Sequence, residues 1–230
     1  MIGMRNLIGG QKKMREYQLA DGRKTPLEDQ IGFDIRPYTK KVIFKPREYL
    51  FHEGAEAEYL YFLERGCAKV MRNQENGRKM LSNFLKAPAF IGEMELLEAK
   101  NCTNEVTALT TCICYRIYCK QCKDQLLNDS KFLRSLCTDL FARLACEVDN
   151  FSKNLSYPLE IRLAHFILES SINNLYCPKH TEAAAYLGVS YRHFLYVLAK
   201  FVQKGWIEKT AQGYWITDAN GLKTISCNIK

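Results

Sequence analysis

The chain has 230 residues, of which 47% are hydrophobic, and its formal net charge is +8. This is enough apolar sequence for a buried core in one or two domains, and no uninterrupted apolar run reaches the roughly eighteen residues that a membrane span needs. The N-terminus lacks the apolar stretch of a secretory signal, so we expect a cytoplasmic protein whose ten cysteines are mostly reduced. The positive charge permits a polyanionic partner without requiring one.

The first half of the chain divides into a polar arm and a strand-rich region. Residues 1–30 are basic and weakly patterned, which predicts a flexible N-terminal arm with one helix over Lys12–Leu19. Residues 31–127 alternate short aromatic and β-branched runs with turn signals, such as Asn76-Gly77 between two strand-like segments. Short strands at this spacing predict an antiparallel β-barrel or sandwich.

Residues 128–157 predict one long helix. The segment lacks Gly and Pro, Asn128–Ser130 can cap its start, and Pro158 follows its end. Its apolar residues recur every three or four positions and form one stripe. Such a stripe can pack against its own domain, or it can form a coiled-coil-like dimer seam between the flanking domains. The candidate seam residues are Leu133, Leu136, Leu140, Leu144, Val148, Phe151 and Leu155.

Residues 158–230 predict a winged helix-turn-helix. An amphipathic helix after Pro158 is followed by two short helical patterns on either side of Gly188, and then by two strand-like runs around Gln212-Gly213. Ser190 is expected to cap the second short helix, whose outward side chains can donate hydrogen bonds or stack on bases. The candidate DNA-binding residues are Thr181, Ser190, Tyr191, Arg192, His193, Tyr196, Lys200 and Lys204.

In this order of domains, and in several stretches, the chain resembles the CRP/FNR family of bacterial transcription regulators, particularly its YeiL branch. The stretches are "YLFHEGAEAEYLYFLERGCAKV", "NGRKMLSNFL", "FIGEMELLE", "LLNDSKFLRSLC", "YPLEIRLAHFIL" and "TEAAAYLGVSYRHFLYVLAKF". The resemblance implies an α+β fold with an N-terminal cyclic-nucleotide-binding-like antiparallel β-roll, a long dimerisation helix and a C-terminal winged helix-turn-helix. It also implies a homodimer that binds double-stranded DNA at an imperfect palindrome, with RNA polymerase as a further partner.

The sequence departs from the cyclic-nucleotide-binding members of the family at the candidate effector pocket. Gly92-Glu93 is present, but Cys102-Thr103 occupies the position of the Arg-Ser pair that holds the cyclic phosphate in those members. A buried phosphate without its guanidinium would be costly to desolvate. We therefore expect a signal other than cyclic AMP, and a cyclic-nucleotide-binding module is the alternative.

Four cysteines, Cys112, Cys114, Cys119 and Cys122, lie close together in the sequence, and the last three repeat the C-x4-C-x2-C spacing of plant-type ferredoxins. Three interpretations remain open: buried core thiols, a redox disulfide, and an iron–sulfur or other metal site. The cysteine-rich N-terminal extension of the family's oxygen sensors is absent. Zinc is disfavoured, because no histidine stands at ligand spacing from a cysteine pair.

The sequence thus predicts a dimeric, sequence-specific transcription regulator rather than an enzyme. An enzyme on a cupin-like barrel would need clustered metal-binding histidines, and His52 is isolated in the strand-rich region.

Overall fold

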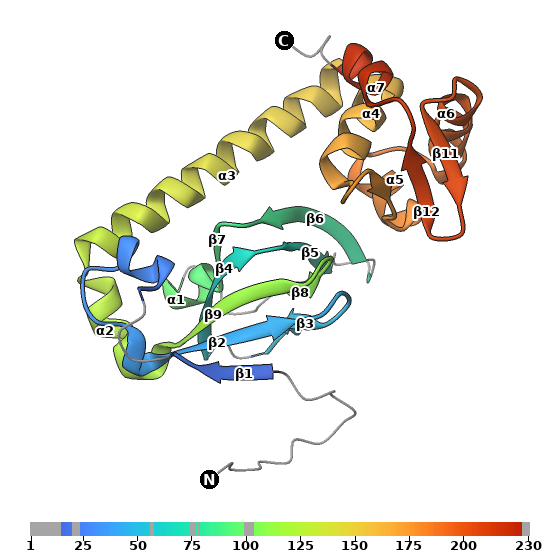
Figure 1. Ribbon diagram of the computed structural model, residues 1–230. Coiled ribbons are helices and arrows are strands. Elements are labelled where there is room, and N and C mark those ends of the chain that lie inside the picture. Colours follow the sequence, from blue (N-terminus) through green and yellow to red (C-terminus); the bar gives the residue numbers. More distant parts are fainter. Residues whose placement is uncertain are drawn as a thin grey trace. The chain divides into compact units, whose positions relative to one another are not determined.

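The computed structural model describes residues 15–19, 24–55, 58–73, 77, 79–98 and 104–226 (Figure 1). The chain divides into two compact units. Unit 1 comprises residues 1–68 and 85–136, and unit 2 comprises residues 69–84 and 137–230. The chain passes between the two units at residues 68–69 and 84–85, within one β-hairpin, and at residues 136–137, within one long helix. Each unit therefore contains part of the hairpin and part of the helix.

The strand-rich region forms two sheets. A five-stranded sheet has the order β1-β2-β9-β4-β7, and a four-stranded sheet has the order β3-β8-β5-β6. The pairs β1–β2, β2–β9, β9–β4, β4–β7 and β3–β8 are antiparallel, as the sequence predicts. The strands are β1 (Arg15–Gln18), β2 (Thr39–Phe44), β3 (Tyr49–Phe51), β4 (Tyr59–Arg65), β5 (Cys67–Asn73), β6 (Lys79–Lys86), β7 (Ala89–Ile91), β8 (Glu105–Ala108) and β9 (Cys112–Tyr118).

The N-terminal arm differs from the expectation. The helix predicted over Lys12–Leu19 is wrong where the structure describes it, because Arg15–Gln18 is the edge strand β1 and pairs with β2. Strand pairing supplies the backbone hydrogen bonds that a four-residue helix could not complete. Two short 3-10 helices follow, η1 (Pro26–Asp29) and η2 (Arg36–Tyr38). The remaining residues of the predicted helix, 12–14, lie outside the described part.

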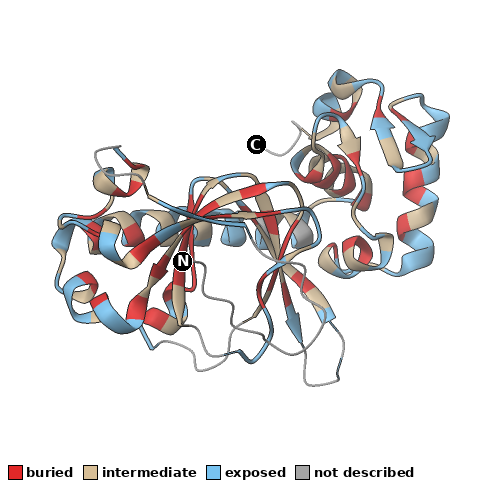
Figure 2. Cartoon of the chain, turned by 60° about the horizontal axis from the view of Figure 1, so that its bottom comes forward, coloured by how far each residue is buried: buried red, intermediate tan, exposed pale blue. Residues whose placement is uncertain are grey.

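Aromatic side chains fill the core of unit 1. Phe90 packs its ring 5.0 Å from Phe62 and 5.5 Å from Phe132, which lies on the first turn of the long helix. These three rings are buried, so they anchor the start of that helix to the five-stranded sheet. The buried residues appear in red in Figure 2. The short helices α1 (Glu93–Leu96) and α2 (Cys119–Leu127) complete this part of the chain.

The long helix is α3 (Ser130–Ser156). Asp129 caps it, because its Oδ1 accepts hydrogen bonds from the backbone amides of Lys131 at 2.9 Å and Phe132 at 3.3 Å. The helix ends before Pro158, as predicted, since proline disfavours helical geometry in the residue that precedes it.

The C-terminal elements are those of a winged helix-turn-helix. They are α4 (Leu159–Ser170), β10 (Leu175–Tyr176), α5 (His180–Tyr186), α6 (Tyr191–Gln203), β11 (Ile207–Thr210), β12 (Gly213–Ile216) and α7 (Ala219–Ser226). The strands form an antiparallel sheet in the order β10-β12-β11. Asp218 caps α7, as its Oδ1 accepts from the amide of Gly221 at 2.9 Å. Within the described residues, no helix is both long and apolar enough to cross a membrane.

Candidate nucleic-acid interface

The turn between α5 and α6 has the geometry that the sequence predicts. Gly188 has a φ of +65°, a conformation that residues with a Cβ rarely adopt. Two residues later, Ser190 caps α6 with its Oγ, which accepts a hydrogen bond from the amide of His193 at 3.2 Å. Helix α5 begins at His180, so Thr181, a candidate DNA-binding residue, lies in its first turn.

The partly buried guanidinium of Arg162 donates a hydrogen bond to the backbone at this turn. The Nε of Arg162 on α4 donates to the carbonyl oxygen of Tyr157 at 3.0 Å, and its Nη1 donates to the carbonyl oxygen of Leu187 at 2.5 Å. One side chain therefore ties the segment that follows α3 to the turn that precedes α6. The sequence carries no signal for this contact, since the two carbonyls are far apart along the chain.

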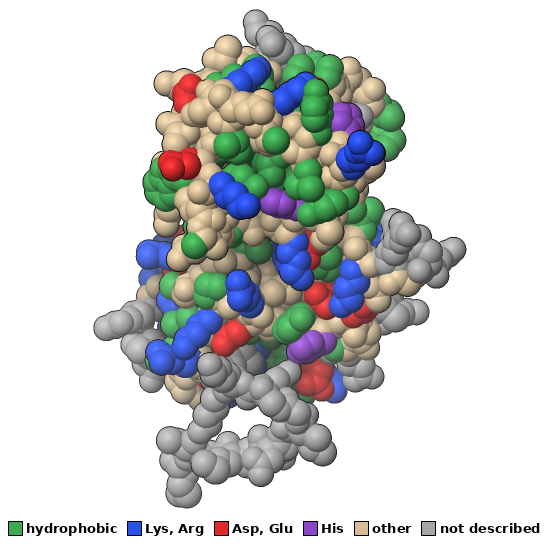
Figure 3. Space-filling view, turned by 90° about the vertical axis from the view of Figure 1, so that its right-hand side faces the viewer, with side chains coloured by type: hydrophobic (Ala, Val, Ile, Leu, Met, Phe, Trp, Pro, Cys, Tyr) green, Lys and Arg blue, Asp and Glu red, His purple; other side chains and the backbone are tan. Residues whose placement is uncertain are grey.

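Helix α6 separates an apolar face from a polar one. Phe194, Val197, Leu198 and Phe201 are buried against the core of unit 2. The opposite face exposes Tyr191 (48%) and Tyr196 (60%) together with Arg192 and His193. In Figure 3, which turns the right-hand side of Figure 1 to the viewer, Lys and Arg side chains stand among the hydrophobic ones.

Two lysines of the predicted interface have partners inside the chain. Lys200 places its Nζ 4.5 Å from the ring centroid of Tyr196 and 3.4 Å from Oε1 of Glu160. The hydrogen bonds to Tyr196 and Glu160 raise the pKa of Lys200. Lys204 lies with its Nζ 4.4 Å from the ring centroid of Trp206. Both ammonium groups therefore lie against aromatic rings.

The wing is a tight hairpin. Gly213 begins β12 with a φ of +151°, and a Cβ there would clash with the backbone carbonyl oxygen of Tyr176. The Oγ1 of Thr210 donates to the carbonyl oxygen of Gly213 at 3.1 Å, which closes the loop. Lys209, next to this loop, is exposed, so the wing presents a cation beside the helix-turn-helix.

The comparisons with known proteins agree with this geometry. Residues 41–129 match the family described as "Cyclic nucleotide-binding domain", and residues 161–225 match "Crp-like helix-turn-helix domain". The chain is 40% identical over 203 residues to the regulatory protein YeiL of Escherichia coli O157:H7, across 88% of this chain and 93% of that protein. The chain belongs to the CRP/FNR family. It is a transcription regulator with a DNA-binding helix-turn-helix and not an enzyme, as the sequence predicts.

Solved structures of CRP/FNR regulators share the fold. A CRP-family regulator from Thermus thermophilus aligns with a TM-score of 0.66 at 19% identity, covering 80% of this chain and 96% of that one. A CRP/FNR-family regulator from Eubacterium rectale aligns with a TM-score of 0.70 at 16% identity, covering 84% and 92%. The predicted fold class is thereby confirmed. The cAMP-activated regulator CRP of Salmonella typhimurium is 28% identical over 102 residues, about half its length.

The structure describes two residues of the candidate effector pocket, Gly92 and Glu93. Gly92 has a φ of +97°, and a Cβ there would lie 2.9 Å from Cζ of Phe51 and from the carbonyl oxygen of Tyr59. Phe51 in turn packs edge-on against Tyr61 at 5.1 Å. Glu93 is 6% exposed at the start of α1. The other two predicted pocket residues, Cys102 and Thr103, lie outside the described residues.

The four clustered cysteines are free thiols. Cys112 and Cys114 are fully buried on β9, and Cys119 and Cys122 are buried on the first turn of α2. Burial raises the pKa of Cys119 to about 11 and that of Cys122 to about 12, so both are protonated at neutral pH. Among the described residues, no three His, Cys, Asp or Glu side chains are grouped so that they could hold a metal ion.

The exposed apolar residues of α3 follow a stricter spacing than the predicted stripe. They are Phe141, Leu144, Val148, Phe151 and Leu155, with exposures from 53% to 73%. Their separations alternate between three and four residues, the pattern of a coiled-coil seam. Leu136 of the predicted stripe is instead 1% exposed in unit 1, and Leu133 and Leu140 are half-buried. Phe141 lies outside the predicted stripe, although a strict alternation of three and four residues indicates it.

Proposed function

We propose that this regulator binds an imperfect DNA palindrome as a homodimer and reads bases with the exposed face of α6. The observation that carries this proposal is the exposed set Tyr191, Arg192 and Tyr196 on a helix whose start is fixed by Ser190 and whose other face is buried. The recognition helix of a helix-turn-helix contacts base edges through residues near its N-terminus. Arg192 is the candidate for guanine, because a guanidinium can donate to O6 and N7 together.

The proposed dimer forms along the five exposed apolar residues of α3. A monomer would leave these large side chains in water over four helical turns, whereas a second copy of the helix would bury them. Two-fold symmetry would then present two α6 helices to half-sites about 34 Å apart on one face of the duplex. The proposed dimer seam is accordingly Phe141, Leu144, Val148, Phe151 and Leu155. RNA polymerase is the further partner that family membership suggests.

The proposed signal is something other than cyclic AMP. The sequence has Cys102 where the cyclic-nucleotide-binding members have the phosphate-binding arginine. A cyclic phosphate needs a charge-assisted donor when it is buried, and a cysteine does not supply one. A redox or iron–sulfur role for the Cys112–Cys122 cluster is the second candidate, and the spacing of the last three cysteines is the observation that favours it.

The test of base reading is a randomised-site selection with the wild type and with Arg192→Ala. We expect a two-fold symmetric consensus for the wild type, and for Arg192→Ala a loss of preference at one base pair in each half-site. The cost should be about 1–3 kcal/mol per half-site. Identical consensus sequences from the two proteins would refute base reading by Arg192. Gln203→Ala, at an exposed position at the other end of α6, serves as the control on the same helix.

A further inference from the structure

The β-hairpin formed by β5 and β6 shares a hydrophobic core with the helix-turn-helix. Met71 and Leu81 of this hairpin are 4% and 2% exposed, and they belong to the same buried cluster as Leu163 and Phe166 of α4. Residues 69–84 of the hairpin group with the C-terminal residues in unit 2. The hairpin is therefore part of the body that carries α5 and α6.

One face of α5 is in contact with this hairpin. Glu182 and Tyr186 are four residues apart and so lie on the same face of the helix. The Nζ of Lys69 on β5 lies 2.7 Å from Oε2 of Glu182, and both side chains are largely buried, at 17% and 14% exposure. At the other end of α5, the ring of Phe84 on β6 lies 6.2 Å from the ring of Tyr186.

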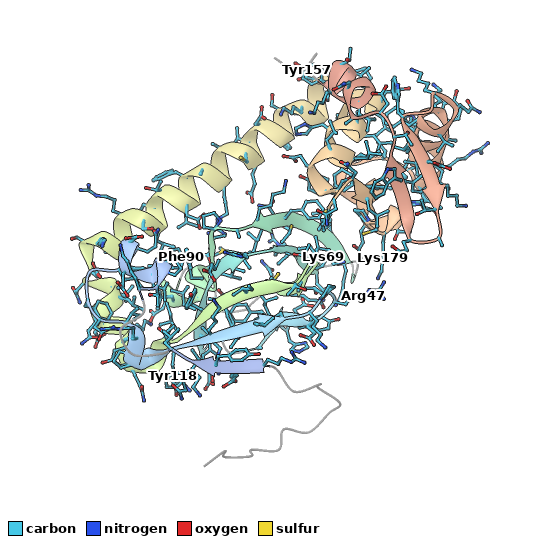
Figure 4. The ribbon with its side chains drawn as sticks, in the orientation of Figure 1. Arg47, Lys69, Phe90, Tyr118, Tyr157 and Lys179 are labelled. Atoms are coloured by element: carbon cyan, nitrogen blue, oxygen red, sulfur yellow. The ribbon has the colours of Figure 1, made fainter. Side chains whose placement is uncertain are left out.

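Phe84 also reaches the helix that precedes the helix-turn-helix. Its ring lies 5.8 Å from that of Phe166, which is itself 5.2 Å from Tyr186. The three rings form a cluster of α4, α5 and the hairpin. Figure 4 shows Lys69 on the hairpin and Lys179 at the start of α5. Lys179 is the second cation near Glu182, at 3.6 Å, but its side chain is 77% exposed.

Helix α5 is thus held from two sides. Ala183 and Ala184 are buried in the core that contains α6, while Glu182 and Tyr186 meet the hairpin. At Ala68 and Leu85 the two strands of the hairpin continue along the chain into unit 1. A displacement of β5 would therefore move Lys69, the partner of Glu182, and a displacement of β6 would move Phe84, which packs on Tyr186, so either would alter the support of α5.

We propose that Lys69 and Glu182 are positioning residues for DNA reading, and that the β5–β6 hairpin holds the helix-turn-helix in its reading pose through them. This inference rests on the proposed function, because its readout is operator binding through α6. A fixed orientation of the helix-turn-helix lowers the conformational entropy that is lost on binding. This effect favours the operator, because its two half-sites must meet both recognition helices in register. Non-specific binding needs no register and depends mainly on charge.

The experiment uses Lys69→Glu, Glu182→Lys and the double exchange in the full-length protein. The single variants change the net charge in opposite directions, and the double variant leaves it unchanged. Each single variant brings two like charges together at a largely buried site, which is destabilising. We expect both singles to lower the ratio of operator affinity to non-specific affinity about tenfold, and the double variant to restore most of it.

Lys179→Glu is the matched control, since it makes the same charge change near the same carboxylate at an exposed position. It should weaken operator and non-specific binding to the same extent. Thermal unfolding identifies any variant that fails to fold, and Glu182→Gln provides a milder version of the same loss. The proposal would be overturned if the single variants kept the wild-type ratio of operator affinity to non-specific affinity. It would also be overturned if the double variant recovered none of a lost ratio.

Hydrogen exchange of the α5 amides separates this proposal from the proposed function. The amides of α5 should exchange faster in the two single variants than in the wild type. In the double variant they should exchange at the wild-type rate. If selection yields no operator, base reading by α6 fails, while the exchange rates still report whether the hairpin supports α5. Unchanged exchange in both singles would refute the positioning role.

Discussion

Glu160, at the start of α4, lies with Oε1 3.4 Å from the ammonium nitrogen of Lys200, on the recognition helix. The pair links the segment after the long helix to the helix that is proposed to read DNA. It also gives Lys200 a partner that competes with any phosphate. A carboxylate so close to the proposed interface would repel the DNA backbone, so we expect the pair to weaken DNA binding.

Replacing Glu160 with Gln should therefore strengthen DNA binding. We expect a severalfold gain for operator and non-specific duplexes alike, and a slope of log K against log salt that is steeper by up to about one. Fluorescence anisotropy over a salt series measures both. Glu169→Gln, on the same helix, is the control for the charge change and should have a smaller effect. Weaker binding by Glu160→Gln would show that the pair orients Lys200 rather than competing with phosphate.

The dimer seam can be tested by placing a charge within it. Leu144→Glu should yield monomers at micromolar concentration, because an unpaired carboxylate would be buried between two helices. Operator binding should fall with dimerisation. Ala142→Glu changes the charge equally at an exposed position two residues away, off the 3-4 pattern, and should remain dimeric. Light scattering distinguishes the two states, and a dimeric Leu144→Glu would contradict the seam.

The two glycines of the DNA-binding elements should differ in their tolerance of a Cβ. At Gly188 no heavy atom lies within 4 Å of the added Cβ, so Gly188→Ala should cost only the left-handed strain, about 1–2 kcal/mol. At Gly213 the added Cβ meets the carbonyl oxygen of Tyr176, so Gly213→Ala should cost more than Gly188→Ala. Chemical denaturation gives both values, and the reverse order would contradict this account of the wing.

The buried thiols should be unreactive in the folded protein. In a background with Cys102→Ser and Cys227→Ser, a thiol-specific disulfide reagent at about pH 8 should modify the exposed Cys137, Cys146 and Cys177 first. Cys112, Cys114, Cys119 and Cys122 should react only on unfolding, because burial raises the pKa of each. Rapid modification of Cys119 or Cys122, or the visible absorption of an iron–sulfur cluster after anaerobic purification, would favour the redox interpretation.

His180 predicts a pH dependence of stability. Burial, with a smaller contribution from the charge of Lys209, holds its pKa below the ordinary value. The unfolded chain takes up the proton near pH 6.5, whereas the folded chain takes it up only at lower pH. The stability that arises from this difference is therefore full above about pH 6.5 and is lost as the pH falls towards the folded pKa. Thermal unfolding of His180→Gln should show less loss between about pH 7.5 and pH 5.5 than the wild type. An equal loss would rule out His180 as the source.

The sequence by itself determined the local elements of this regulator. Gly188, Ser190 and the buried spacing of Phe194, Val197 and Phe201 act over a few residues, so their capping, turn and periodicity signals suffice to predict α5, the turn and α6. The same holds for the long helix, which starts at a capping aspartate and stops before Pro158.

Only the tertiary structure decided which side chains meet across the chain. Lys69 and Glu182 are separated by 113 residues, and Lys200 and Glu160 by 40, so no local pattern connects either pair. The tertiary structure also decided that Leu136 is buried in unit 1 while Phe141 is exposed, although both are apolar residues of the same helix. Periodicity indicates that a face is apolar, but its burial depends on what packs against it, and that is fixed by the whole fold.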